Sequence, residues 1–326
     1  MGINIELKET ADYLCDYTFN FHWHNQTIDP GDKIPFQENT RYSYSEIVEA
    51  LKAGDDIHIK GDVGKNFAYS MGADLRHFGG SGDAEKAGNI FVDGNIGPEA
   101  AMGMVSGSLY ASGEIEEPFG NIIEVLSDIE GYRKFRSITD IACNGPGNDT
   151  LVSNEYNSSD RTLILNDGLL RGTIGARCYN PVKIIVENDT HNGTGVLMKG
   201  GTVIVHGNAG MNTGSHLYGG KVAIHGSVGE FAGAYMKAGV LAFHEAKGFI
   251  GAGMAGGSIY SKKKAKTSSP AAKVKMKGED SALMRKLMGA GRVESMLYNK
   301  YEVEEEKEKF MEVRMRDGSI VMRRID

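Results

Sequence analysis

Short hydrophobic segments with alternating polar positions recur along this chain at a spacing of nineteen residues. Three consecutive blocks of that length cover 192–210, 211–229 and 230–248, and a shortened fourth block follows at 249–261. In each full block, two apolar residues separated by one position precede a polar or glycine turn residue. In chain order these pairs are Val203 and Val205, Val222 and Ile224, and Leu241 and Phe243. Because side chains alternate across a strand, both members of a pair face the same side.

The same register extends into the N-terminal half of the chain. Gly61, Gly94 and Gly113 take the turn position there, each after two apolar strand residues. Gly94 and Gly113 are nineteen residues apart, whereas Gly61 and Gly94 are thirty-three apart, which indicates an insertion of fourteen residues near 74–87. The pattern predicts strands at 57–60, 90–93, 109–112, 184–187, 203–206, 222–225, 241–244 and 259–261.

A single strand with two inward residues cannot bury itself, but strands stacked from successive coils shield one another. The expected fold is a right-handed parallel β-helix with about nineteen residues per coil and short α-helical N- and C-terminal extensions. Strands joined by antiparallel hairpins are the alternative, which the strict register disfavours. A count of 44 glycines against 7 prolines fits a chain that turns often, because glycine permits positive φ at the corners.

The pattern divides the chain into three parts. Residues 1–53 form an N-terminal extension, in which 43–54 reads as a helix that Ser45 caps. Residues 54–261 form the β-helix, with an insertion near 114–182 that interrupts the coils. Residues 262–326 form a basic, helical C-terminal tail, with helices expected at 281–291 and 293–310 and a hairpin around Asp317 and Gly318.

Charge separates the tail from the rest of the molecule. The whole chain carries a net charge of −7, which argues against a general nucleic-acid binder. The tail has 17 basic and 11 acidic residues, or +6, so residues 1–261 carry −13. We therefore expect the tail to pack on the solenoid or on a partner subunit. No apolar run is long enough to span a bilayer, so no membrane contact is expected. Three scattered cysteines without a disulfide framework fit a reducing, cytoplasmic location.

Three histidines, His206, His225 and His244, recur at the nineteen-residue spacing. In a β-helix they stack on one outward face, one on each rung. A metal or proton-relay ladder is one interpretation, but the ligands of one metal must converge on a point, which a parallel ladder does not favour. The other interpretation is a surface or interface stack, and these three residues are the candidate interface.

Other motifs assign no catalytic, cofactor-binding or metal-binding residue. The sequence 251–256 satisfies GxGxxG, but it lies within the glycine repeat and no helix is expected after it, as a dinucleotide site requires. Cys143 and Cys178 lie in turn-like contexts without an identifiable base and are expected to be buried or incidental thiols. The cluster around Trp23, at 21–24, is expected to anchor the N-terminal segment.

The coils at 229–261 resemble the GXGXG family. There, Met236 and Met254 are each followed three positions later by a glycine, Gly239 and Gly257, and then by strand residues. This family includes the last domain of the glutamate synthase large chain, an independent third subunit in archaeal versions, and the C-type subunit of formylmethanofuran dehydrogenase. The resemblance covers about 57–113 and 184–261. The dehydrogenase subunit usually has an Asp-Trp-Arg-Gly-Met segment, which is absent here, so the glutamate synthase side is favoured.

The resemblance implies a scaffold that holds catalytic partners, because the family's coils are not catalytic. The first hypothesis is a non-catalytic β-helix subunit of a glutamate synthase-like oxidoreductase complex, in which the partners hold flavin and iron–sulfur cofactors. The second is the C-type subunit of a formylmethanofuran dehydrogenase-type complex for CO2 reduction, with molybdopterin or tungstopterin in the partners. The third is a stand-alone hydrolase with its site in 114–182. No cofactor is expected in this chain itself.

Overall fold

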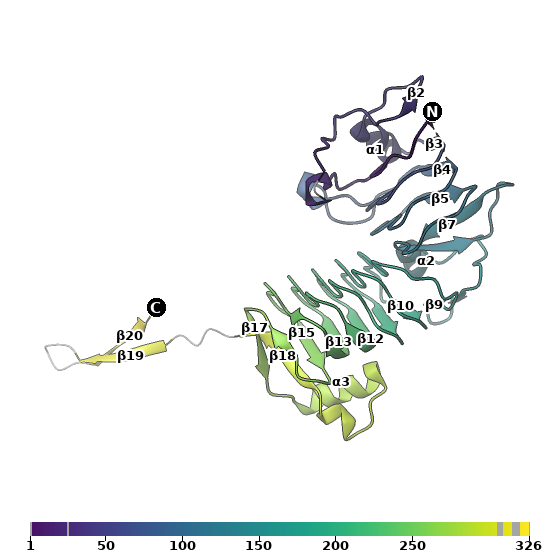
Figure 1. Cartoon of the computed structure of the whole chain (residues 1–326). Coiled ribbons are helices and arrows are strands. Elements are labelled where there is room, and N and C mark those ends of the chain that lie inside the picture. Colours follow the sequence, from purple (N-terminus) through teal and green to yellow (C-terminus); the bar gives the residue numbers. More distant parts are fainter. Residues whose placement is uncertain (1, 25, 305–308, 315–319, 326) are drawn as a thin grey trace.

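The computed structural model describes the chain except for residues 1, 25, 305–308, 315–319 and 326. It is a parallel β-solenoid of about nine turns, with coils of about nineteen residues and only 12% helix. The predicted β-helix is therefore confirmed (Figure 1). Within the described residues, no helix has the length and apolar character needed to cross a membrane.

The strands form two principal sheets, one in each half of the solenoid. The first has the order β2-β1-β3-β4-β5-β7-β6 and the second β17-β18-β15-β13-β12-β11-β10-β9-β8. The first comprises β1 (Ile3–Leu7), β2 (Gln37–Glu38), β3 (Ile57–Lys60), β4 (Asn89–Asp93), β5 (Ser108–Ala111), β6 (Ile122–Val125) and β7 (Arg133–Ser137). The second comprises β8 (Glu155–Asn157), β9 (Thr162–Leu165), β10 (Lys183–Val186), β11 (Thr202–Val205), β12 (Lys221–Val228), β13 (Val240–Ala246), β15 (Ser258–Ser261), β17 (Ala271–Val274) and β18 (Asn299–Val303).

Successive rungs pair in parallel at the spacing that the sequence predicts. Val203 lies opposite Val222, and Val222 lies opposite Leu241, each nineteen residues further along the chain. These inward residues are fully buried and form the core of the second half. Ile57 and Ile90 pair in the same way in the first half. All eight predicted strands are present. β12 and β13 are longer than predicted, and the other six begin and end within one residue of the predicted positions.

The N-terminal segment is part of the solenoid, whereas its sequence had suggested an extension outside the coils. β1 pairs in parallel with β3, with Ile3 opposite Ile57, and so adds a rung. The expected helix follows as α1 (Tyr44–Ala53). Its N-cap is Ser43 and not Ser45, because the Ser43 hydroxyl accepts from the Glu46 backbone N–H and completes a capping box.

The insertion near 114–182 ends the first sheet and begins the second. β7 pairs antiparallel with both β5 and β6, and α2 (Ile138–Asn144) follows. The coil path nevertheless continues across the insertion, because Phe119 lies beside Arg171 in a parallel bridge. Arg171 is buried there with Asp167, its guanidinium donating to both carboxylate oxygens at 2.6 Å. The coils before and after the insertion are therefore in direct contact at this bridge.

The inserted loop at 74–87 ties the two halves together along the solenoid. It contains η2 (Arg76–Phe78). The Arg76 guanidinium lies 5.6 Å from the centre of the Tyr218 ring, and Arg177 donates to the Gly82 carbonyl at 3.2 Å. Lys199 forms an ion pair with Asp83. The fourteen extra residues thus contact coils that lie more than ninety positions further along the chain.

The C-terminal tail packs on its own solenoid and is only partly helical. The helix expected at 281–291 is present as α3 (Gly278–Met288). The prediction of a helix at 293–310 is wrong. A short 3-10 helix, η3 (Glu294–Met296), is followed there by β18, which pairs antiparallel with β15 and β17. The open edge of β15 and the burial of Tyr301 outweigh the helical propensity of this segment.

The remaining strands form two small sheets of two strands each. β14 (Phe249–Ile250) pairs in parallel with β16 (Lys266–Thr267). β19 (Lys309–Arg314) and β20 (Ile320–Ile325) pair antiparallel. They flank 315–319, which holds Asp317 and Gly318, so the expected hairpin strands are present although the turn itself lies outside the described residues.

Candidate functional site

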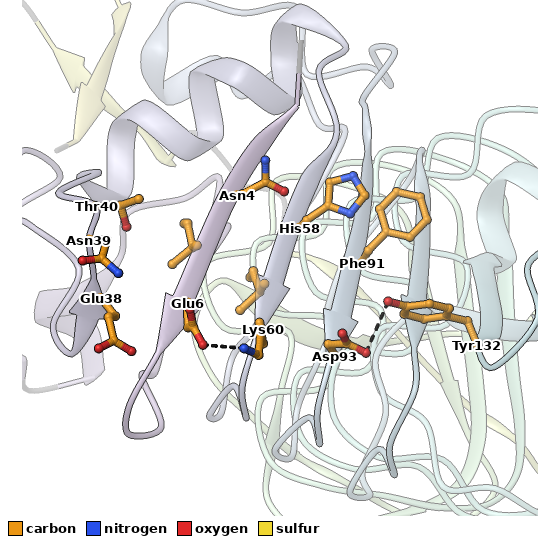
Figure 2. Close-up of a pocket in the computed structure, with 12 residues that line it drawn as sticks. Asn4, Glu6, Glu38, Asn39, Thr40, His58, Lys60, Phe91, Asp93 and Tyr132 are labelled. Carbon is orange, nitrogen blue, oxygen red and sulfur yellow. Dashed lines mark hydrogen bonds and ion pairs between the residues drawn. The ribbon is translucent and has the colours of Figure 1, made fainter.

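A groove lies along the outward face of the first sheet (Figure 2). The alternation that turns Ile57 and Ile59 inward turns His58 and Lys60 outward, and β1 and β4 contribute their own outward residues. The cavity has a volume of about 440 Å³. Its lining residues are Asn4, Ile5, Glu6, Glu38, Asn39, Thr40, His58, Ile59, Lys60, Phe91, Asp93 and Tyr132.

A stack of rings crosses this face from strand to strand. His58, Phe91 and Tyr110 lie directly opposite one another in the parallel register of β3, β4 and β5. The His58 and Phe91 rings are 4.5 Å apart and inclined by 6°, and the Phe91 and Tyr110 rings are 4.5 Å apart and inclined by 16°. Tyr132 meets the stack edge-on, 6.1 Å from Phe91. The aromatic stack is defined as these four residues. Three of them, His58, Phe91 and Tyr132, line the groove and give it a rigid surface, whereas Tyr110 is buried behind them.

The charged residues of the groove are engaged with one another. Lys60 donates to Glu6 at 2.6 Å, and this hydrogen bond raises the pKa of the Lys60 ammonium. The Tyr132 hydroxyl donates to Asp93 at 3.3 Å. Burial, and then the Asp93 charge, raise the pKa of Tyr132. With Glu38, the lining holds three carboxylates and one ammonium, so the groove favours a cationic group in contact with it.

The far end of the aromatic stack contacts an exposed carboxylate, Asp128, and a buried ammonium, Lys134. The Tyr110 hydroxyl donates to Asp128 at 2.9 Å. Lys134, buried beside it on β7, forms ion pairs with Asp128 at 3.2 Å and with Asp149 at 3.1 Å. These contacts hold the ring of Tyr110 in place, so a ligand meets a preformed surface and little ordering is required.

The three predicted histidines stack as expected, at the end of the strands in the second sheet. The rings of His206 and His225 are 5.1 Å apart, and those of His225 and His244 are 6.4 Å apart. His206 is exposed and its Nδ1 lies 2.8 Å from Glu187. Burial lowers the pKa of His225, which the Leu287 backbone offsets in part, and burial lowers that of His244 as well.

The histidine stack is less free than the sequence suggested, because the tail covers part of the face beside it. α3 packs against β12 and β13 through Met284, Leu287 and Met288. His225 and His244 are only partly exposed. Of the three histidines, His206 alone is exposed and so accessible for contact with another molecule. Within the part of the chain that the structure describes, no group of three or more His, Cys, Asp or Glu side chains converges as metal ligands do.

The structure also places the other sequence motifs. The GxGxxG segment at 251–256 lies in a coil between β14 and β15, as expected, so it does not open a helix. Cys143 and Cys178 come together in the core, which their separation of 35 residues had concealed. Residues 21–24 form η1 (Phe21–His24) with Phe21 buried, but the side chain of Trp23 lies outside the described residues.

Sequence reasoning missed the groove, although a signal for it was present. His58, Phe91 and Tyr110 occupy one register position, between the two inward residues of their strands. Three rings at one position of a parallel stack predict a ladder. The walls were not predictable, because Glu38 reaches the groove through β2, an antiparallel strand outside the repeat.

Comparison with known proteins finds a relative in an archaeon. No protein-family model matches the sequence, and no solved structure matches it. A protein of Methanothermobacter thermautotrophicus, named only as an uncharacterized protein, is 41% identical over 214 residues. The match covers 64% of this chain and 67% of that protein. The chain belongs to the same family as this archaeal protein.

Proposed function

We propose that this chain is a non-catalytic β-helix scaffold subunit of a glutamate synthase-like oxidoreductase complex. Partner chains carry the amidotransferase and flavin chemistry, including the iron–sulfur cofactors. The proposal rests on the likeness of the coils around Met236 and Met254 to the GXGXG family. The complex operates in the cytoplasm.

The observation that carries the scaffold role is the contrast between a filled interior and a preformed outer groove. The inward residues of the rungs, such as Ile90 and Leu241, are fully buried and leave the coil interior packed with apolar side chains. Functional groups are therefore on the outside, where the aromatic stack is held by strand pairing. A rigid, half-apolar surface of this kind suits protein docking, since aromatic residues dominate the energetics of interfaces.

The carboxylates of the groove support docking in preference to acid–base chemistry. Glu6 is bound to Lys60, and Glu38 to Lys8 at 3.1 Å. Asp93 accepts from Tyr132. A general base needs a free carboxylate near a reacting proton. Charges that are already engaged instead orient a partner, and the surplus of carboxylates favours a partner segment with Lys or Arg side chains.

The test is purification of the tagged chain from its native host, followed by mass spectrometry and cofactor spectra of whatever elutes with it. Stoichiometric amidotransferase and flavin chains are expected. The matched variants are His58→Ala in the groove and His206→Ala on the second sheet, and only the first should reduce partner recovery. Chains with molybdopterin or tungstopterin would assign the second hypothesis. A lone monomer, or turnover of glutamine or esters by the isolated chain, would contradict the scaffold role.

A further inference from the structure

Two of the three cysteines meet inside the molecule. Cys143 is at the end of α2, in the insertion, and Cys178 is in the coil that precedes β10. Their Sγ atoms are 3.4 Å apart, and both side chains are about 1% exposed. The third, Cys15, is buried in the separate hydrophobic cluster of the first half. The contact therefore selects one pair out of three.

Each of the two buried cysteines is followed in the chain by an exposed residue. Asn144 follows Cys143 and is exposed, and Tyr179 follows Cys178 and is 47% exposed. α2 ends there at Gly145, which has a φ of 82°. Access to the sulfur atoms therefore requires local opening where the end of α2 meets the segment around Tyr179. Local openings of native proteins occur at a lower free-energy cost than global unfolding.

Neighbouring segments hold the two thiols in register. The backbone carbonyl of Cys143 accepts from Arg161, in the turn between β8 and β9, and from the Asn180 side chain at 3.0 Å. A disulfide requires the sulfur atoms to approach to about 2.0 Å, so the present contact must close by about 1.4 Å. Small side-chain rotations supply a movement of this size.

We propose that Cys143 and Cys178 are a redox modification site, which a small organic disulfide converts to an intramolecular disulfide. The Cys143 thiolate attacks one sulfur of the reagent, whose S–S bond breaks and releases one thiolate. Cys178 then gives up its proton and attacks the Cys143 sulfur, which releases the second thiolate. The protein loses two electrons and two protons, and the reagent is reduced to two thiols. The product links α2 covalently to the segment that precedes β10.

The electrostatics of the site choose the attacking sulfur. The hydrogen bond with Cys178 holds the pKa of Cys143 well below its ordinary value, with further help from the backbone at Asn180 and Tyr179 and from Arg161. The same contact and burial raise the pKa of Cys178. Burial raises that of Cys15, which should therefore remain an unreactive thiol. Cys143 is the nucleophile, and Cys178 resolves the mixed disulfide.

The experiment treats the full, folded chain with oxidised glutathione, then denatures it, alkylates free thiols and measures the intact mass and peptide map. One alkylated cysteine, Cys15, and a linked peptide pair containing Cys143 and Cys178 are expected. The melting temperature of the oxidised protein should rise by a few degrees, because the link restricts the conformations that the unfolded chain can reach. Refolding the reduced protein in a glutathione redox buffer provides a second route that does not depend on access.

Three variants make the result decisive. Cys178→Ser should stop at a glutathione adduct on Cys143, Cys143→Ser should form neither adduct nor link, and Cys15→Ala should still form the link. The proposal is overturned if all three thiols of the wild type remain alkylatable after both treatments. It is also overturned if the linked peptides contain Cys15, or if Cys143→Ser reacts at Cys178 as fast as the wild type reacts.

Discussion

The outward faces of the two sheets differ although their inward faces follow the same repeat. In the second sheet the outward row contains Ala223 and Ala242, and α3 lies directly on them. In the first sheet the equivalent positions hold Phe91 and Tyr110, whose rings are largely buried in their own stack, and the groove opens at the end of the row where His58 is exposed. The two small residues let α3 approach β12 and β13 closely, and Tyr260, in the same row on β15, packs with the helix. The large rings of the first sheet stack on one another instead.

Polar contacts hold the covering helix on the second sheet. The Tyr260 hydroxyl donates to Asp280 in the first turn of α3 at 2.6 Å, and Lys300 forms an ion pair with the same carboxylate at 3.0 Å. Burial alone would raise the pKa of Asp280, but these partners hold it below its usual range. The comparison teaches that outward residues decide whether a face of this solenoid is covered by another segment of the chain or stays partly open.

The largest effect is expected where the two halves are alike, at the inward positions. Val205→Asp would place an unpaired carboxylate in the filled core and should cost about 5 kcal/mol or more of unfolding free energy. Ile59→Asp should cost as much in the first half, whereas Lys221→Asp, on the exposed side of β12, should be nearly neutral. Denaturant titration of the three variants measures this. Wild-type stability for Val205→Asp would refute the inward assignment.

A ring placed beneath α3 should make the second face resemble the first. Ala242→Phe overfills the contact with Met284 and should cost about 1–3 kcal/mol. Amide hydrogen exchange should then accelerate across α3 and remain unchanged in the strands. Ile185→Phe adds a ring in the same outward row on β10, away from α3, and serves as the control. If α3 is equally protected from exchange in both variants, the size of the residue at position 242 does not control the docking of the helix, and the prediction is wrong.

Loss of the central ring should weaken the groove with a smaller effect on stability. Phe91→Leu keeps most of the apolar area but removes the contacts with His58 and Tyr110, for a cost of about 1 kcal/mol. Phe91→Tyr retains the stack and is the matched control. Partner recovery from the native host should fall for Phe91→Leu alone. If both variants recover partners like wild type, the groove is not the docking surface.

The smallest effect concerns pH and only the second face. His225 and His244 have lowered pKa values, so the unfolded chain takes up protons before the folded chain does as the pH falls below about 6.5. Their contribution to stability is present above that pH and is lost below it. His206, Lys262 and Glu294 also face this row. Hydrogen exchange of α3 should rise between neutral pH and about pH 5, and the double variant His225→Asn, His244→Asn should flatten the response.

Much of the solenoid could be predicted because its rungs are specified locally. Alternation within four residues identifies the inward pair of each strand, such as Val222 and Ile224. The nineteen-residue repeat then predicts which strands lie next to each other. Parallel pairing at a constant offset then follows from the need to bury those pairs. The helix α1 could also be predicted from the sequence, because its apolar face and its capping residues are close together in the chain.

The rest depended on partners that are distant in sequence. Residues 299–303 became β18 because β15 offered an open edge, and α3 found Ala223 and Ala242 because they are small. Cys143 meets Cys178 only after α2 packs against the segment that precedes β10. The sequence by itself determined which residues face inward, since burial follows the strand period. Tertiary structure alone decided which outward face is covered, since that depends on where a separate segment finds space to pack.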